Sequence, residues 1–236
     1  MLKLIMALSK RNKLTYRHPI EKVIISIMPI IMIGFTKNPI IIIGNIIFFA
    51  IMHKMAENNM KIVLKFTSHI AVFAAFSSLT FVFDYGIKYV GIILLKSLSA
   101  GLCLSFLSLT TPIDQILYLI SKNQHLKDMC DIAKSMERFL VLINEEYNIM
   151  YLSMKSRGGF GTFSSKIKDT GKLAALLFVN TMERWKSIKE GINSRCYIGY
   201  MPYLGEDFIL SKKNLILACS YNLFLIISIL LFNNGL

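Results

Sequence analysis

The chain has 236 residues, of which 54% are hydrophobic and 17% are charged, and its mean hydropathy is +0.54. A single soluble core of this size cannot bury so much apolar surface, so the composition excludes an ordinary water-soluble globular protein. The 27 Lys and Arg residues outnumber the 14 Asp and Glu residues, which gives a formal net charge of +13. An apolar and basic chain indicates an integral membrane protein with basic cytoplasmic parts.

The charges divide the chain into parts of different character. Residues 1–22 carry six basic residues and one acidic residue. Residues 112–214 carry 15 basic and 11 acidic residues, so this stretch must be largely hydrated. The remaining residues hold only eight charges. We therefore predict three regions: 1–111, a basic N-terminal arm with four transmembrane segments; 112–214, a cytoplasmic region; and 215–236, the last transmembrane helix.

Five apolar segments are candidate membrane helices, at residues 23–36, 39–52, 66–83, 89–109 and 215–232. The last three reach the roughly 17–25 residues that a spanning helix needs. The first two contain about 14 residues, or about 21 Å of helix against a hydrocarbon core of about 30 Å. We expect flanking residues to extend them, or the bilayer to be thinner there. A single re-entrant hairpin across residues 23–52 is the alternative.

The basic residues between the apolar segments predict the orientation. If the N-terminal arm is cytoplasmic, the loop at residues 53–65 also faces the cytoplasm, as does the hydrated stretch. The basic-rich loops then all lie on the inner side of the membrane. The number of crossings changes by two if residues 23–52 do not cross the bilayer, and all other loops keep their side of the membrane. The charge distribution therefore does not determine the number of spans.

Three amphipathic helices are predicted in the hydrated stretch, at residues 113–122, 132–154 and about 167–194, because their apolar residues recur every three or four positions. The second ends at Ser156-Arg157-Gly158 and the third at Ser194-Arg195-Cys196. An arginine on a last turn beside small residues projects a planar fork of five donors, which suits an acidic groove on a partner. Alternatively, the helices lie on lipid headgroups and each arginine only complements its helix dipole. The repetition of the same ending favours a partner.

The sequence lacks the motifs of several classes of enzyme. It contains no G-x-x-x-x-G-K-[ST] loop, so we do not expect this chain to hydrolyse ATP. Its four histidines are scattered and it has no H-E-x-x-H or CxxC motif, so no metal site or cofactor is expected. Nucleic-acid binding is not expected either, because no basic face with interleaved aromatic residues lies clear of the bilayer. An integral-membrane enzyme anchored at the surface by its amphipathic helices is the alternative from another class.

These motifs resemble the transmembrane T component of energy-coupling factor (ECF) transporters, the EcfT/CbiQ family. Ser156-Arg157-Gly158 is similar to the first Ala-Arg-Gly motif of that family, and residues 192–199 are similar to its later Ala-Arg-Gly-Tyr-x-Gly motif. The run His18-Pro19-Ile20-Glu21-Lys22 is similar to the Pro-x-x-Lys that begins its first span. Serine replaces alanine in both motifs, and Cys196 replaces a glycine, which removes conformational freedom at that position.

The resemblance implies an all-α integral membrane protein with about five transmembrane helices and a cytoplasmic insert of two long coupling helices and one shorter helix. It implies a non-catalytic permease subunit in a bacterial or archaeal cell membrane. Two cytoplasmic ATPases would drive it, and a separate membrane-embedded S component would bind the cargo. The residues that would engage the ATPases are Ser156, Arg157, Gly158, Ser194, Arg195 and Cys196.

The residues that follow Gly199 bear on the cargo. The run Tyr200-Met201-Pro202-Tyr203-Leu204 looks like the dedicated cobalt-type subunit, CbiQ. This resemblance favours cobalt uptake with a CbiM-like S component. Nickel or a vitamin is the alternative cargo, since the S component selects it.

Overall fold

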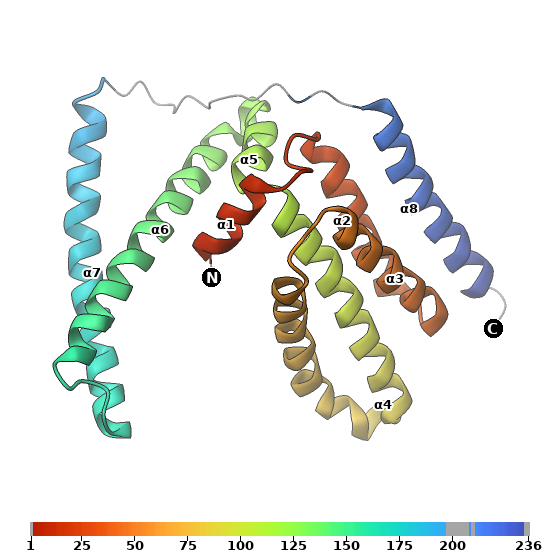
Figure 1. Ribbon diagram of the computed structural model, residues 1–236, viewed down its shortest axis with the longest axis horizontal. Coiled ribbons are helices and arrows are strands. Elements are labelled where there is room, and N and C mark those ends of the chain that lie inside the picture. The colour runs from red at the N-terminus through yellow and green to blue at the C-terminus, as the bar shows by residue number, and fades with distance from the viewer. Residues whose placement is uncertain (1, 197–207, 209–210, 234–236) are drawn as a thin grey trace. The chain divides into compact units, whose positions relative to one another are not determined.

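The computed structural model describes residues 2–196, 208 and 211–233, and the regular secondary structure of these residues is helical. The chain forms two compact units, one of Met1–Ile116 with Glu206–Leu236 and the other of Leu117–Gly205 (Figure 1). The first unit contains the apolar helices and the second the amphipathic pair. The run from Tyr200 to Leu204, which favoured a cobalt-type subunit, lies outside the described residues.

The helices of the first unit are α1 (Leu2–Arg11), α2 (Pro19–Phe35), α3 (Pro39–Met55), α4 (Met60–Thr110), the start of α5 (Ile113–Ser121), and α8 (Lys212–Asn233). Both α2 and α3 begin with a proline, which has no amide hydrogen to leave unpaired. The side chains of His18 and Asn38 cap the two helices by accepting bonds from the amides of Ile20 and Ile40. Each helix has 17 residues, so flanking residues do extend the two short apolar segments.

Helix α4 consists of two arms that meet at Gly86. The backbone there has φ 78° and ψ 168°, a conformation that only glycine adopts easily. Figure 1 shows the chain folding back at this point. The segments predicted at residues 66–83 and 89–109 are therefore separate arms of one hairpin. Within the described residues, α4 and α8 are long and apolar enough to cross a membrane, and α3 is apolar but shorter.

The two arms of α4 approach closely where the second arm carries small residues. A Cβ added to Gly101 would lie 3.1 Å from Cγ2 and 3.4 Å from Cα of Thr67. Ser97 and Ser105 stand four residues to either side of Gly101. This spacing of small residues allows close backbone approach and is typical of packed membrane helices.

Buried polar side chains join the apolar helices. The amide of Asn45, on α3, donates to Ser99 Oγ at 2.7 Å and lies 3.5 Å from Cys103 Sγ, both on α4. Tyr221, on α8, donates its hydroxyl to Asn45 Oδ1 and stacks on Phe48 with 3.8 Å between ring centroids. Asn45 therefore links three helices in a core where apolar contacts alone would leave their register loose.

A second buried polar group lies at the C-terminal end of α3. His53 is fully buried, and its Nε2 lies 3.2 Å from the carbonyl oxygen of Leu102 and 3.0 Å from Ser105 Oγ. The amide of Asn58 donates to His53 Nδ1 at 2.9 Å, which places the ring proton on Nε2. His53 thus fixes the end of α3 against the second arm of α4.

Two adjacent charged residues at the start of α2 hold distant parts of this unit. The ammonium group of Lys22 donates to the carbonyl oxygens of Leu14 and Thr110, both at 3.0 Å, and lies 3.4 Å from that of Thr15. The carboxylate of Glu21 accepts a bond from the amide of Ser211 at 3.0 Å. Both side chains are buried. The chain leaves the first unit shortly after Thr110 and returns just before Ser211, so these two residues hold both ends of the intervening segment.

Lys96 also ends on a backbone carbonyl. Its ammonium group, on the second arm of α4, donates to the carbonyl oxygen of Gly34 at 2.8 Å. This oxygen lies in the last turn of α2, where carbonyls lack intrahelical partners and a cation complements the helix dipole. Lys96 therefore stabilises the end of α2.

The second unit contains a 3₁₀ turn, η1 (Gln124–Leu126), and two long helices, α6 (Lys127–Ser156) and α7 (Phe163–Asn193). They contact each other on either side of a short connection (Figure 1). Both begin earlier than their apolar periodicity predicted. Helix α7 starts at Phe163 because the Thr162 hydroxyl oxygen accepts a bond from the amide of Ser165.

Replacing Lys22 by methionine tests its structural role. The apolar stem is kept, but three buried carbonyl oxygens lose their charged donor, so the free energy of unfolding should fall by about 2–3 kcal/mol. The control is Lys13→Met, which breaks an exposed ion pair with Glu57 and should cost about 1 kcal/mol or less. Denaturant unfolding of the full chain in detergent measures both, and equal losses would contradict the role assigned to Lys22.

Candidate functional site

The first predicted tip, Ser156-Arg157-Gly158, is a well-formed helix end. The amide of Gly159 donates to the carbonyl oxygen of Met154 at 3.0 Å, and that of Gly158 donates to Lys155 at 3.1 Å. These two bonds form a Schellman motif, in which the left-handed residue is Gly158, with φ 81°. The Ser156 hydroxyl donates back to Ser153 O at 2.9 Å, so serine in place of alanine brings no unpaired polar group.

The second tip also has a left-handed residue after its arginine, but its hydrogen bonds differ from those of the first. The amides of Arg195 and Cys196 donate to the carbonyl oxygens of Ile192 and Asn193, both at 3.1 Å. Cys196 has φ 56°, so a left-handed residue follows Arg195 just as Gly158 follows Arg157. Gly158 directly follows the C-cap of α6, Arg157, whereas Cys196 is the second residue after the C-cap of α7, Ser194. The departure from glycine at this position therefore falls where the backbone needs glycine most. The Ser194 hydroxyl donates to Glu190 O at 2.8 Å.

Both arginines are free to reach a partner. Arg157 and Arg195 are exposed, and neither makes an ion pair with any residue that the structure describes. They lie at opposite ends of α7, since Arg157 precedes its first turn and Arg195 follows its last. A helix of 31 residues is about 46 Å long. The structure therefore presents two separate basic tips and not one basic patch.

The connection between α6 and α7 is held by one carboxylate. Asp169 Oδ2 accepts bonds from the Phe160 amide at 3.0 Å and the Ser165 hydroxyl at 2.7 Å. These bonds, the first above all, lower the pKa of Asp169. Gly159 must remain glycine, because an added Cβ would lie 2.8 Å from the carbonyl oxygen of Met154. The first tip is thus fixed relative to the start of α7.

An ion pair joins the two helices away from their connection. Arg184 Nη2, on α7, lies 2.7 Å from Glu146 Oε1, on α6, and the Glu146 side chain is only 16% exposed. Tyr151 packs against Phe160 closer to the tip, with 4.9 Å between ring centroids. Helical periodicity in the sequence offers no signal that a polar residue such as Glu146 pairs with a second helix.

Chemistry-bearing residues do not gather elsewhere in the described part of the chain. No group of three or more His, Cys, Asp or Glu residues comes close enough there to hold a metal ion. Cys103, Cys130, Cys196 and Cys219 are free thiols. His18 and His53 serve as a helix cap and a buried structural residue.

The fold and the two tips define a class of protein. Apolar helices long enough to cross a membrane belong to the same chain as a pair of long amphipathic helices with exposed basic ends. These features define an all-helical protein of the membrane-spanning class. The sequence matches the cobalt transport protein family CbiQ over residues 10–204, so the chain belongs to this family of ECF transporter T components.

The chain is also similar to two curated proteins. The chain is 31% identical over 109 residues to a protein of Methanocorpusculum labreanum named as a fused cobalt transport protein, CbiMQ, a match that covers 46% of this chain and 18% of the relative. It is 29% identical over 147 residues to the uncharacterized protein MJ1089 of Methanocaldococcus jannaschii, covering 62% of this chain and 54% of the relative. The chain thus spans about half or less of each relative's length.

Exchanging the two left-handed residues tests the geometry of the tips. Gly158→Ala should destabilise the protein by about 1 kcal/mol, because nothing surrounds the new Cβ and only backbone strain is added. Cys196→Gly should stabilise it by up to about 1 kcal/mol by removing the same strain. Gly171→Ala is the control, since this helical glycine also has open space and alanine there should stabilise α7. Denaturant unfolding measures the free energy of unfolding of each variant. If Gly158→Ala and Gly171→Ala changed it in the same direction, the proposed backbone strain at Gly158 would be refuted.

Proposed function

We propose that this chain is the non-catalytic transmembrane coupling subunit of an ECF-type ABC importer. It transmits the ATP-driven motion of two cytoplasmic ATPases to a separate membrane-embedded S component, with cobalt as the cargo. Arg157 and Arg195, with the small residues beside them, dock in acidic grooves of the ATPases. The residues in contact are Ser156, Arg157, Gly158, Ser194, Arg195 and Cys196.

The separation of the two exposed arginines is the observation that carries this proposal. Tips at opposite ends of a helix about 46 Å long do not fit one small groove, so they favour two docking sites. Each arginine offers a planar, bidentate donor to a carboxylate, the geometry that gives strong charge-assisted bonds. Two similar tips therefore suit two similar ATPases.

Transmission of motion needs stiff elements between the tips. Helix α6 has 30 residues and α7 has 31, and neither is interrupted. Asp169 fixes their connection, and the pair of Glu146 and Arg184 fixes them farther along. A displacement imposed at one tip is then carried by the helix pair as a unit instead of being absorbed by bending.

The apolar faces of the two helices favour a second partner. Ile132, Met136 and Leu140 on α6 are each more than half exposed, as are Leu176 and Val179 on α7. Exposed apolar area of this extent marks an interaction surface. The relative named as a fused CbiMQ favours a CbiM-like S component as the membrane partner and cobalt as the ion.

We assign about five crossings to the membrane part: α2, α3, the two arms of α4, and α8. At about 1.5 Å per residue, α2 and α3 are about 25 Å long, so they cross where the bilayer is thin. The N-terminal arm and residues 112–214 are then cytoplasmic and residues 215–236 form the last span. This topology places the basic loops on the cytoplasmic side of a bacterial or archaeal cell membrane.

Charge reversal at both tips tests the coupling role. Arg157→Glu with Arg195→Glu should weaken co-purification with the ATPases at least about a hundredfold, because each acidic groove then faces a like charge. Cobalt uptake by cells should be lost, while membrane insertion is kept. Arg138→Glu is the matched control, since it reverses an exposed charge in the body of α6 that belongs to neither tip motif.

Three outcomes of this test are informative. A double variant that still binds both ATPases and supports uptake would refute the role of the tips. Loss of binding in the Arg138 control as well would show that overall charge, and not the tips, holds the ATPases. Uptake of nickel or of a vitamin instead of cobalt would leave the coupling role intact and change the cargo.

A further inference from the structure

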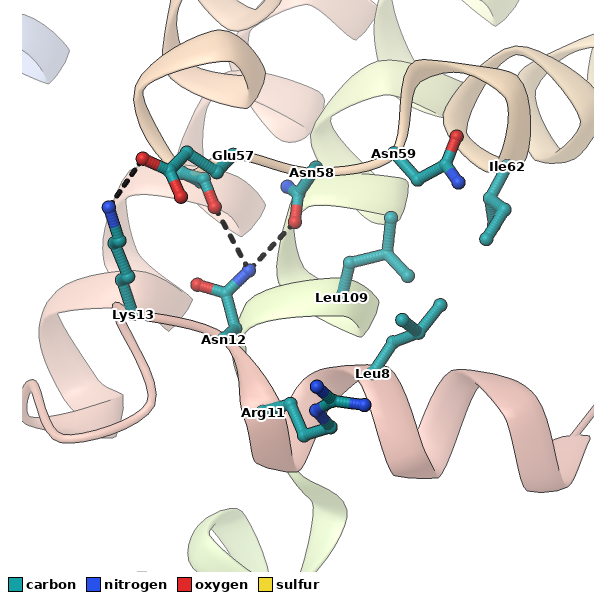
Figure 2. A pocket seen from close by; sticks show the side chains of 10 residues that line it. Leu8, Arg11, Asn12, Lys13, Glu57, Asn58, Asn59, Ile62 and Leu109 are labelled. Atoms are coloured by element: carbon teal, nitrogen blue, oxygen red, sulfur yellow. Dashed lines mark hydrogen bonds and ion pairs between the residues drawn. The ribbon is translucent and has the colours of Figure 1, made fainter.

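A cavity of about 160 Å³ lies between the end of α1 and the connection from α3 to α4. Figure 2 shows Leu8 and Arg11 of α1 on one side and Asn58, Asn59 and Ile62 on the other. The second arm of α4 contributes Leu109. One water occupies about 30 Å³ of liquid, so the cavity has room for a group of several heavy atoms.

The polar wall of this cavity is held in place by its own hydrogen bonds. The Asn12 amide donates to Asn58 Oδ1 at 2.8 Å and to Ala56 O at 3.3 Å, and Asn12 Oδ1 accepts from the amide of Leu14 at 2.8 Å. Glu57, the acidic residue of the lining, is paired with Lys13. The carboxylate is thus neutralised by its neighbour, and the wall is formed before any ligand binds.

Arg11 supplies the unbalanced charge. It lines the cavity, is exposed, and makes no ion pair with any residue in the described part of the chain. A guanidinium group matches the geometry of a phosphate and binds it through two parallel bonds. Lys54, in the last turn of α3, and Lys61, in the first turn of α4, are both exposed and add positive potential on either side of the connection.

The surroundings favour an amphipathic ligand. Leu8, Ile62 and Leu109 give the cavity an apolar side. Two methionines that flank the α3–α4 connection are largely exposed, Met55 by 71% and Met60 by 50%. In a membrane protein such side chains face lipid, so acyl chains would lie beside the cavity. A phosphate carrying acyl chains satisfies both sides, whereas free phosphate leaves the apolar side unused.

We propose that this cavity binds the phosphate of an anionic phospholipid of the inner leaflet, with Arg11 as its principal ligand. Asn12 and Asn58 frame the site, and Leu8 and Ile62 contact the start of the acyl chains. The assignment to the inner leaflet rests on the orientation proposed above. Basic pockets at the cytoplasmic ends of membrane helices are suited to anionic headgroups.

The test counts lipids bound to the full chain in detergent by native mass spectrometry, with phosphatidylglycerol or phosphatidylcholine as the probe. The first phosphatidylglycerol should bind more tightly than phosphatidylcholine, and Arg11→Ala should weaken it about fivefold. The matched control is Arg17→Ala, which removes the same charge from the same exposed arm outside the cavity and should leave binding unchanged. Ile62→Trp, which fills the cavity without altering charge, should weaken binding as much as Arg11→Ala.

Other outcomes would overturn the proposal. Equal losses in Arg11→Ala and Arg17→Ala would mean diffuse attraction to the basic arm. Displacement of the lipid by inorganic phosphate would assign the cavity to free phosphate. Full binding by Ile62→Trp, with an unchanged unfolding midpoint, would place the lipid elsewhere. The ATPases are absent from this experiment, so its failure would not affect the proposed docking of Arg157 and Arg195. Failure of the docking experiment would likewise not affect the proposed binding of lipid.

Discussion

The adjacent buried charges Glu21 and Lys22 are the constraint on which the arrangement depends. Removing two charges from water is costly unless each finds partners, and here the partners are backbone groups at the two boundaries of the inserted region. Lys22 holds the carbonyl of Thr110, 88 positions away, and Glu21 holds the amide of Ser211, 190 positions away. One turn of α2 is thereby bonded to the chain on both sides of the segment that contains α5, α6 and α7.

The elements that could be predicted from sequence are those whose signal is local. Apolar length marked the arms of α4 and α8, and Gly158 marked the end of α6, because a left-handed residue is required there. Helix α1 was missed, although residues 2–11 are amphipathic, because the arm was interpreted by its charge alone. Helix α7 starts before its apolar face does, since Thr162, a capping residue, sets the first turn. The bonds of Glu21 and Lys22 could not be predicted, because nothing in a single sequence identifies partners so distant.

The candidate site also has features that could be predicted from the sequence and features that could not. The two small-Arg-small endings were visible as a repeat, and the structure shows that the repeat is conformational, with a left-handed residue after each arginine. The supports of the tips were not visible: Asp169 folds back on the connection, and Glu146 pairs with Arg184 on a different helix. Neither contact has a signal in the sequence, because helical periodicity describes one helix at a time.

The central claim is that each basic tip engages its own ATPase, and cross-linking in the assembled transporter tests it most directly. The exposed native thiol of Cys196 and a cysteine introduced by Lys155→Cys, in a Cys219→Ser background, would each carry benzophenone maleimide. Illumination should yield a product with the mass of one chain joined to two ATPase polypeptides. Products in which both positions link to a single ATPase polypeptide, or in which neither position links to any, would contradict the account.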